Sequence, residues 1–203
     1  MRLFHYHLVT SEVRTVEARY VGRLGFRLVA RYGRVGDESL IATAGTSWEE
    51  LDGRAFRLRL SELQLGAVNV VVQPGHWRVP RVDHLGIVLE EEELEALLER
   101  AGLRNLPVQE RGSRRTFVSI DSGYRIEVHP PRDWIEEMLD SADVLELAEL
   151  QLRTDRPEHQ AQVLADILDI ESTADAVAIG TTLVRFVPGG PEGRPELHGE
   201  RFG

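Results

Sequence analysis

Three consecutive segments decide the fold of this chain: VDHLGIVL at 82–89, EEEELEALLERAGL at 90–103 and PVQERGSRRTFVSIDSGYRIEVHPP at 107–131. The first is apolar and rich in β-branched residues, which predicts a strand. The second places leucines at helical spacing and ends near Gly102, a favourable helix stop. The third contains two alternating runs separated by Ser122-Gly123, a pair suited to a hairpin loop. With a short strand around Val108, the segments predict a β-α-β-β-β unit.

Polar side chains on the first and last strands of this unit share one face. If Leu85 and Ile87 cover the helix, alternation turns His84 to the opposite face of the sheet. Ile126 and Val128 on the last strand likewise turn Glu127 and His129 to the side of His84. Imidazole and carboxylate groups projecting from one curved face are good ligands for a divalent metal.

The unit resembles the vicinal oxygen chelate superfamily, which includes glyoxalase I, extradiol dioxygenases, and bleomycin and fosfomycin resistance proteins. The motifs that carry the resemblance are Asp83-His84-Leu85-Gly86-Ile87 on the first strand and the hairpin from Asp121 to Glu127. The resemblance implies an α+β fold, in which tandem βαβββ modules form a curved mixed sheet around a central cup.

Composition sets outer bounds on the class of protein. The chain has 203 residues, 42% of them hydrophobic, which is enough for one large domain or two small ones. Apolar runs are too short for a membrane helix and the start lacks a signal peptide's apolar core, so a cytoplasmic location is expected. The absence of Cys excludes disulfides and thiolate ligands. A net charge of -10 argues against binding nucleic acid.

The N-terminal residues repeat the pattern of the central unit. Leu3–Val9 predicts a strand, and Ser11 can cap a helix that ends near Gly25. Further strands are expected at Phe26–Arg31, Ser39–Thr43, Phe56–Leu60 and Ala67–Gln73, with Trp48–Gly53 as a polar connection. Residues 1–75 and 80–131 are therefore interpreted as two modules that pair over residues 1–131.

Aligning the two modules places His5 at the position of His84. His7 shares the face of His5 and is nearly as good a candidate ligand. Val71 takes the position that Glu127 has in the second module, so one carboxylate is missing. The resemblance implies that His5, His84 and Glu127 are the metal ligands, because dioxygenases of this superfamily use two His and one Glu. Such a set leaves open positions on Fe²⁺, the first choice, or on Mn²⁺ or Zn²⁺.

The resemblance implies a metal-dependent dioxygenase or lyase acting on a small substrate that chelates the metal through adjacent oxygens. His129 and His7 are the candidate catalytic groups that move protons. Arg111, Arg114 and Arg115 could attract an anionic substrate or simply form an exposed hairpin edge. No Tyr precedes Glu127 on the neighbouring strand, where ring-cleaving enzymes are expected to have one. The alternative is a metal-free small-molecule binding protein of the bleomycin-resistance type.

A third, degenerate βαβββ-like module is predicted at 145–187, after a linking helix at 132–144. Its strand Leu147–Thr154 precedes a helix at Pro157–Leu168 and a hairpin. Alignment puts Glu149 at the position of His5 and Arg185 at that of Glu127, which predicts an ion pair in place of a metal site.

The C-terminal residues 188–203 are rich in Gly, Pro and charge and are expected to form an exposed tail. The third module then has no partner within the chain. A homodimer with an interface from Leu145 to Val187 is therefore expected, since a twofold axis could place two third modules together. The alternative is that this module extends the sheet of the other two and leaves a monomer.

Overall fold

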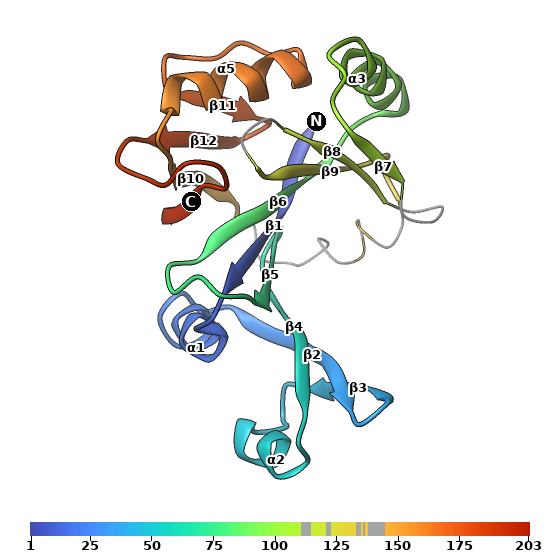
Figure 1. The fold of residues 1–203 in the computed structure, drawn as a ribbon, viewed down its shortest axis with the longest axis vertical. Coiled ribbons are helices and arrows are strands. Elements are labelled where there is room, and N and C mark those ends of the chain that lie inside the picture. Colours follow the sequence, from blue (N-terminus) through green and yellow to red (C-terminus); the bar gives the residue numbers. More distant parts are fainter. Residues whose placement is uncertain (111–114, 121–122, 133–134, 136, 138–144) are drawn as a thin grey trace.

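A computed structural model describes residues 1–203 except 111–114, 121–122, 133–134, 136 and 138–144. The described strands form one mixed, 13-stranded sheet whose main path runs β11-β12-β10-β13-β6-β1-β5-β4-β2-β3. Strands β9, β8 and β7 branch from β6 (Figure 1). The predicted α+β class with a large curved mixed sheet is confirmed.

The first module comprises β1, α1 and the strands β2 to β5. The element bounds are β1 Arg2–Thr10, α1 Val13–Arg23, β2 Arg27–Val35, β3 Glu38–Thr43, α2 Trp48–Gly53, β4 Arg57–Leu65 and β5 Val68–Pro74. Strand β5 returns parallel to β1. The expected polar connection at Trp48–Gly53 is instead a short helix, because Ser47 and Glu50 form a capping box that satisfies its first backbone N–H groups.

The second module is a βαβββ unit. Its elements are β6 Arg81–Val88, α3 Glu91–Leu103, β7 Val108–Glu110, β8 Thr116–Ser119 and β9 Arg125–His129. Strand β9 is parallel to β6 and antiparallel to β8. The linking helix expected at 132–144 falls mostly outside the described residues.

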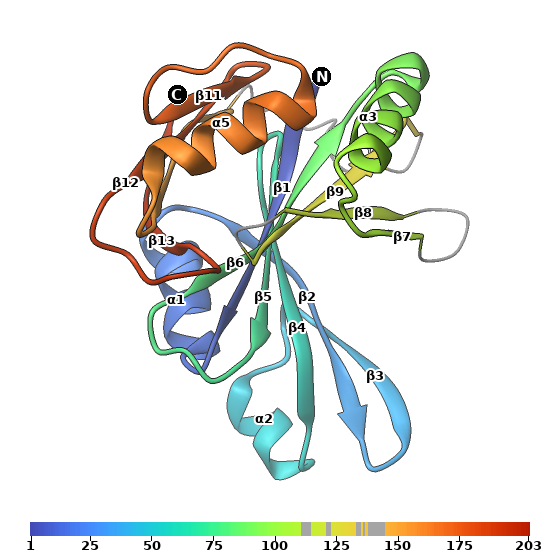
Figure 2. The same ribbon diagram turned by 45° about the horizontal axis from the view of Figure 1, so that its top comes forward.

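The first strands of these two modules lie side by side and antiparallel at the centre of the sheet (Figure 2). Tyr6 and Leu8 of β1 and Leu85 and Ile87 of β6 are fully buried in the main core. The same core takes in side chains of α1, α3 and α5. The alternate residues of β1 and β6 therefore face the side of the sheet opposite the helices.

The third module comprises β10 Leu147–Arg153, α5 Pro157–Leu168, β11 Ala176–Ile179 and β12 Thr182–Val187, and is followed by β13 Glu196–Phe202. Strand β12 is parallel to β10, as β5 is to β1 and β9 is to β6. Strand β13 pairs antiparallel with β10 on its other edge and also meets β6.

The prediction of an exposed tail at 188–203 is therefore wrong. The charges of β13 are paired: Glu196 binds Arg153 with an O–N distance of 2.8 Å, and Glu200 binds Arg19 of α1 at 2.6 Å. The Glu200 side chain is fully buried and also accepts a hydrogen bond from Tyr20. These ion pairs let a charged segment complete the sheet. The third module thus extends the sheet of the other two, which removes the reason given for a dimer.

Candidate metal centre

The sheet register brings four candidate side chains to one place. His7 of β1 lies opposite His84 of β6, and His5 lies opposite Gly86. Across the other edge of β6, Glu127 also lies opposite Gly86. Gly86 is therefore at the centre of the group. A Cβ added to Gly86 would lie 2.8 Å from the Cβ of His5, so only glycine lets the two strands hold His5 in this position.

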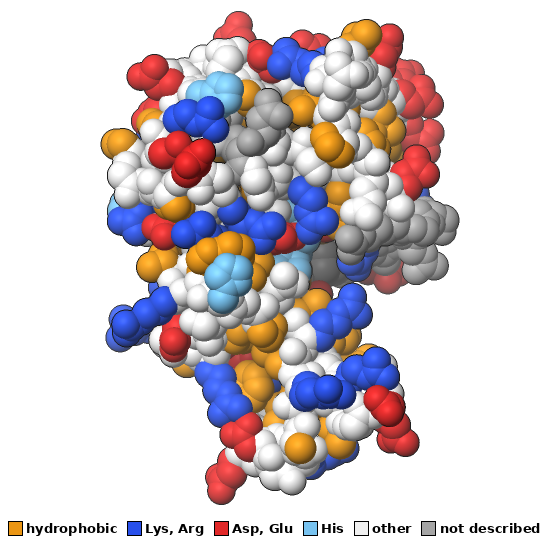
Figure 3. All heavy atoms as spheres, viewed as in Figure 1, with side chains coloured by type: hydrophobic (Ala, Val, Ile, Leu, Met, Phe, Trp, Pro, Cys, Tyr) orange, Lys and Arg blue, Asp and Glu red, His pale blue; other side chains and the backbone are white. Residues whose placement is uncertain are grey.

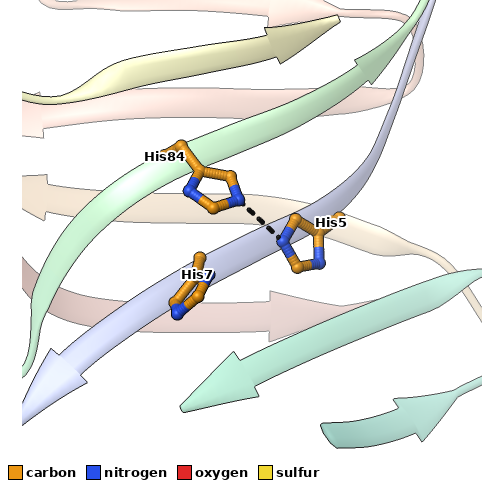
Figure 4. Close-up of side chains that lie close together, drawn as sticks. All are labelled: His5, His7 and His84. Carbon is orange, nitrogen blue, oxygen red and sulfur yellow. Dashed lines mark hydrogen bonds between the residues drawn. The ribbon is translucent and has the colours of Figure 1, made fainter. Parts of the chain in front are cut away.

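The side chains of His5, His84 and Glu127 converge. The Nε2 atoms of His5 and His84 lie 3.1 Å apart, and the Nε2 of His84 lies 2.9 Å from Oε2 of Glu127. Figure 4 shows His5 and His84 turned toward each other with His7 beside them. One ring nitrogen from each of these three histidines lies within 4.8 Å of the other two. The geometry therefore offers His7 as a ligand beside His5 or in its place.

The outer nitrogen of His5 is held by a chain of side chains from the first module. Nδ1 of His5 lies 2.8 Å from Oδ1 of Asn69, and Nδ2 of Asn69 donates to Oε1 of Glu62 at 3.0 Å. Tyr32 donates its hydroxyl to the other oxygen of Glu62 at 2.9 Å. Because Asn69 presents its oxygen, the Nδ1 of His5 carries the proton and Nε2 keeps its lone pair for the cavity.

His84 is held by a carboxylate in the same way. Its Nδ1 donates to Oδ2 of Asp83 at 2.8 Å. Asp83 is 6% exposed and is also bound by Arg125 and, at 3.1 Å, by Nη2 of Arg194. A hydrogen bond from the outer nitrogen to an acceptor is the usual support of a metal-binding histidine. Both histidines of the predicted ligand set have such a support.

Glu127 has its own neighbours on the side away from His84. Its Oε1 accepts from Nε2 of His129 at 3.0 Å, and Nε of Arg115 lies 3.6 Å away. His129 is fully buried and is not among the residues that line the cavity, whereas His7 lines it. His129 thus contacts the candidate ligand Glu127 rather than the open space.

Burial and neighbouring charges move the pKa values of these groups in opposite directions. Burial, reinforced by the charge of His84, lowers the pKa of His5 to about 4 and that of His7 well below its ordinary value. Burial opposes the charge of His84 as well, but hydrogen bonds to Asp83 and Glu127 outweigh it and raise the pKa of His84. Burial would raise the pKa of Glu127, yet its hydrogen bonds with His129 and His84 lower it. Among His5, His7 and His84, only His84 has a site that favours its protonated form.

A cavity of about 340 Å³ opens above these residues. Four polar lining residues were missed by the sequence analysis: Tyr32, Arg59, Glu62 and Asn69. The available signal was alternation, since Asn69 is two residues from Val71 and Glu62 pairs with Val71 across β4 and β5. Of the three arginines expected at the mouth, Arg115 lines the cavity, and Arg111 and Arg114 lie outside the described residues.

The residues present fit a divalent cation. Imidazole and carboxylate donors are the set that Fe²⁺, Mn²⁺ and Zn²⁺ accept. The Nε2 of His7 is buried and, within the described part of the chain, has no hydrogen-bond partner, which is a cost that a ligand or cation would remove. The absence of a Cβ at Gly86 leaves room for the His5 side chain beside His84 and Glu127.

Among the described residues, the corresponding position of the third module holds no such donor set. Nε of Arg185 lies 2.9 Å from Oε1 of Glu149, which confirms the predicted ion pair. Asp175 binds the same guanidinium at 2.9 Å, and Arg201 of β13 lies 3.4 Å from the second oxygen of Glu149. Glu149 and Asp175 are thus both paired with arginine.

Comparison with solved structures identifies the fold. The chain superposes on a halotolerant catechol dioxygenase with a TM-score of 0.62 at 11% identity, covering 99% of this chain and 69% of that one. It matches the Mn(II)-bound glyoxalase from Novosphingobium aromaticivorans with a TM-score of 0.55 at 11% identity, covering 97% and 63%. A fusion of a xylose isomerase-like TIM barrel with 4-hydroxyphenylpyruvate dioxygenase gives 0.61 at 12% identity, covering 99% and 36%.

The chain therefore has the fold of the vicinal oxygen chelate superfamily, as the motifs around His84 and Glu127 indicate. It spans about a third to two thirds of the length of these solved chains. A scan of family models and a search of curated proteins found no match to the sequence. Every helix within the described ranges is too short or too polar to span a bilayer.

Proposed function

We propose that this protein is a metal-dependent enzyme acting on a small substrate that chelates a divalent cation through two adjacent oxygens. The proposed ligands are His5, His84 and Glu127, with His7 as an additional ligand or proton-moving group. The observation that carries the proposal is the convergence of His5 Nε2, His84 Nε2 and Glu127 Oε2 beside a cavity, each imidazole supported at Nδ1 by a side-chain acceptor.

A bound cation supplies Lewis-acid polarisation of the substrate oxygens and open positions for a second reactant. Dioxygenase or lyase chemistry fits this arrangement, and Fe²⁺ is the proposed metal, with Mn²⁺ and Zn²⁺ as alternatives. His7 can accept a proton from a substrate hydroxyl, because burial keeps its imidazole neutral. His129 holds one oxygen of Glu127 and so leaves the other directed at His84. Arg59 and Arg115 line the cavity and favour an anionic substrate.

Metal analysis tests this proposal directly. Protein purified without added ions is assayed for transition metals, then titrated with Fe²⁺ under anaerobic conditions, with Mn²⁺ and with Zn²⁺. We expect close to one equivalent bound with one of these ions and a rise in melting temperature upon binding. Less than about a tenth of an equivalent, with no gain after titration, would contradict a metal centre.

A metal-free binding protein is the second candidate. The observation that favours it is the hydrogen bond between His84 Nε2 and Glu127 Oε2, which pairs a cationic imidazole with a carboxylate without any metal. The cavity of about 340 Å³ is large enough for part of an aromatic ligand. This candidate predicts that cationic aromatic compounds raise the melting temperature and that divalent metals do not.

The assembly that fits this geometry best is a monomer. Strand β13 covers the edge of β10 and joins it to β6, so the third module has its partner within the chain. Light scattering at micromolar concentration decides between the alternatives. A mass near 22.9 kDa supports the monomer, and twice that mass supports the homodimer expected from the sequence.

A further inference from the structure

Asp83 has three partners that come from three parts of the chain. His84 follows it on β6, Arg125 lies on β9, and Arg194 lies in the segment between β12 and β13. Arg194 binds Oδ1, whereas His84 and Arg125 bind Oδ2. The segment that follows the third module thus supplies one cation to the carboxylate that holds the imidazole of His84.

The backbone around Arg194 is fixed against the second module. The N–H of Val82 donates to the carbonyl of Pro195 at 2.9 Å, and the N–H of Leu197 donates to the carbonyl of Pro80 at 2.8 Å. Arg194 also donates from Nε to the carbonyl of Gly123 at 3.2 Å. A Cβ at Gly123 would lie 3.0 Å from the backbone nitrogen of Arg194, so the two segments are in close contact.

The side chain of Arg194 is confined as well. Its guanidinium lies over the ring of Trp77, 5.4 Å from the centroid, and the side chain is 25% exposed. Arg81 stacks on the same ring at 4.9 Å. Figure 3 shows Arg side chains crossing the middle of the molecule, while Asp and Glu side chains gather over α3. A planar guanidinium held by an aromatic ring loses little further freedom when it binds a carboxylate.

We propose that Arg194 is a positioning residue for the metal centre: it fixes Asp83, which orients His84, so that the segment leading into β13 completes the site. This inference rests on the proposed function for its effect on metal binding. Asp83 is almost fully buried, and a buried carboxylate adopts one orientation only when its lone pairs are satisfied. With Oδ1 taken by Arg194, Oδ2 remains directed at Nδ1 of His84. His5 has no such dependence, because Asn69, Glu62 and Tyr32 all belong to the first module.

The variant Arg194→Gln tests this inference against the matched control Arg153→Gln. Arg153 binds Glu196, two residues from Arg194, and its Nη2 lies 2.8 Å from Oε2 of Glu196. The control therefore removes an ion pair at the start of β13, the strand that follows Arg194, without touching Asp83. Both variants are compared by melting temperature, and Co²⁺ affinity is measured from the visible absorption of the bound ion.

We expect similar losses of melting temperature in the two variants, but a Co²⁺ affinity about tenfold weaker only in Arg194→Gln, with an altered visible spectrum. Arg194→Lys should recover part of the Co²⁺ affinity, because the ammonium supplies the positive charge but not the planar set of N–H donors of a guanidinium. Equal Co²⁺ affinity and identical spectra in wild type and Arg194→Gln would overturn the inference. Wild type that binds no Co²⁺ would instead count against the proposed metal centre.

A second measurement uses the metal-free protein. The Nδ1 proton of His84 is hydrogen-bonded to Asp83, and His84 is only 5% exposed. This proton should therefore exchange slowly with water and give a downfield resonance in the proton NMR spectrum. We expect this resonance in wild type and Arg153→Gln, and its loss or broadening in Arg194→Gln. An unchanged resonance in Arg194→Gln would refute the positioning role whether or not the protein binds metal.

Discussion

The boundary between strands β1 and β6 and the boundary between strands β10 and β13, here called the two seams, have the same strand arrangement but different side chains. In each, an antiparallel strand lies on one edge of a module's first strand, and a parallel strand lies on the other edge. Glu149 stands opposite Arg201 and beside Arg185, where His5 stands opposite Gly86 and beside Asn69. The first seam collects histidines around a glycine, and the second collects arginines around a glutamate.

This difference shows that the same strand arrangement does not determine whether a seam can bind a metal. A guanidinium carries five donors and no acceptor, so Arg185 and Arg201 surround Glu149 with positive charge, which disfavours a cation there. Imidazole can present a lone pair once its other nitrogen is bound, which is the arrangement at His5 and His84. The side chains at equivalent positions, rather than the fold, therefore decide where a metal can bind.

The largest effect should come from His84, because it contacts both His5 and Glu127. We expect His84→Ala to weaken binding of the preferred divalent metal by more than about 100-fold, since it removes a proposed ligand rather than a supporting group. The matched control is Glu149→Ala at the equivalent position of the third module, which should leave the affinity unchanged. Calorimetric titration measures both. An equal loss of affinity in Glu149→Ala would mean that the metal binds near Glu149 in the third module rather than at His84.

Val71 offers a way to extend the comparison by adding the carboxylate that the first module lacks. Val71 lines the cavity opposite His7 and is 8% exposed. In Val71→Glu without metal, we expect the free energy of unfolding to fall by about 2 kcal/mol, because a buried carboxylate loses its hydration. Saturating metal should recover more stability in this variant than in wild type.

The neutral variant Val71→Gln separates the charge of the new side chain from its size. It should be destabilised to a similar extent but gain no additional metal-dependent stability. Urea denaturation with and without Zn²⁺ provides the measurement. Equal recovery in Val71→Glu and Val71→Gln would show that the carboxylate does not reach the metal.

The sequence predicted the parts of this site that follow from local alternation. The faces of His84 and Glu127 could be derived because Leu85, Ile87, Ile126 and Val128 mark the core side of their strands. The alignment of Glu149 with His5 was equally local, and the ion pair with Arg185 is present.

The missed parts depend on residues that are distant in the sequence. Strand β13 contains few apolar residues, and it is stable in the sheet because Glu196 meets Arg153 and Glu200 meets Arg19 and Tyr20. No periodicity within residues 196–202 indicates those partners. The side chains that support the histidines were missed for the same reason, since Arg194 is 110 residues from His84 along the chain.

The charge on His84 predicts a pH dependence of stability at the candidate metal centre. The pKa of His84 is raised above its ordinary value of 6.5, so its contribution to stability is complete below that value and is lost as pH rises through the raised pKa. The pKa of Glu127 is lowered below its ordinary value of 4.5, so its contribution is present above 4.5 and is lost as pH falls through the lowered pKa. Both contributions are present between 4.5 and 6.5, but the lowered pKa values of His5 and His7 weaken stability as pH falls below 6.5. The window in which the site most stabilises the metal-free protein therefore lies at the upper end of this range.

Denaturation across pH checks this window. In His84→Gln we expect the decline of stability on the alkaline side to be smaller than in wild type. Metal affinity should show the opposite trend and increase with pH, because the cation competes with the proton on Nε2 of His84. Histidine ordinarily titrates between roughly pH 5 and 8. A metal affinity that does not change across this range would argue against His84 as a ligand.

The smallest effect on stability is expected at the ion pair of the third module, between Arg185 and Glu149. The side chain of Arg185 is 34% exposed, so solvent screens its attraction to Glu149. We expect Arg185→Gln to lower the free energy of unfolding by less than about 1 kcal/mol, because Arg201 still lies near the second oxygen of Glu149. The difference from wild type should shrink in about 1 M NaCl, as screening predicts. Urea denaturation at low and high salt measures it, with metal affinity as the control that should not change. A loss of more than about 2 kcal/mol in the free energy of unfolding that persists in high salt would contradict this expectation. It would show that the ion pair between Arg185 and Glu149 behaves as a buried one, despite the exposure of Arg185.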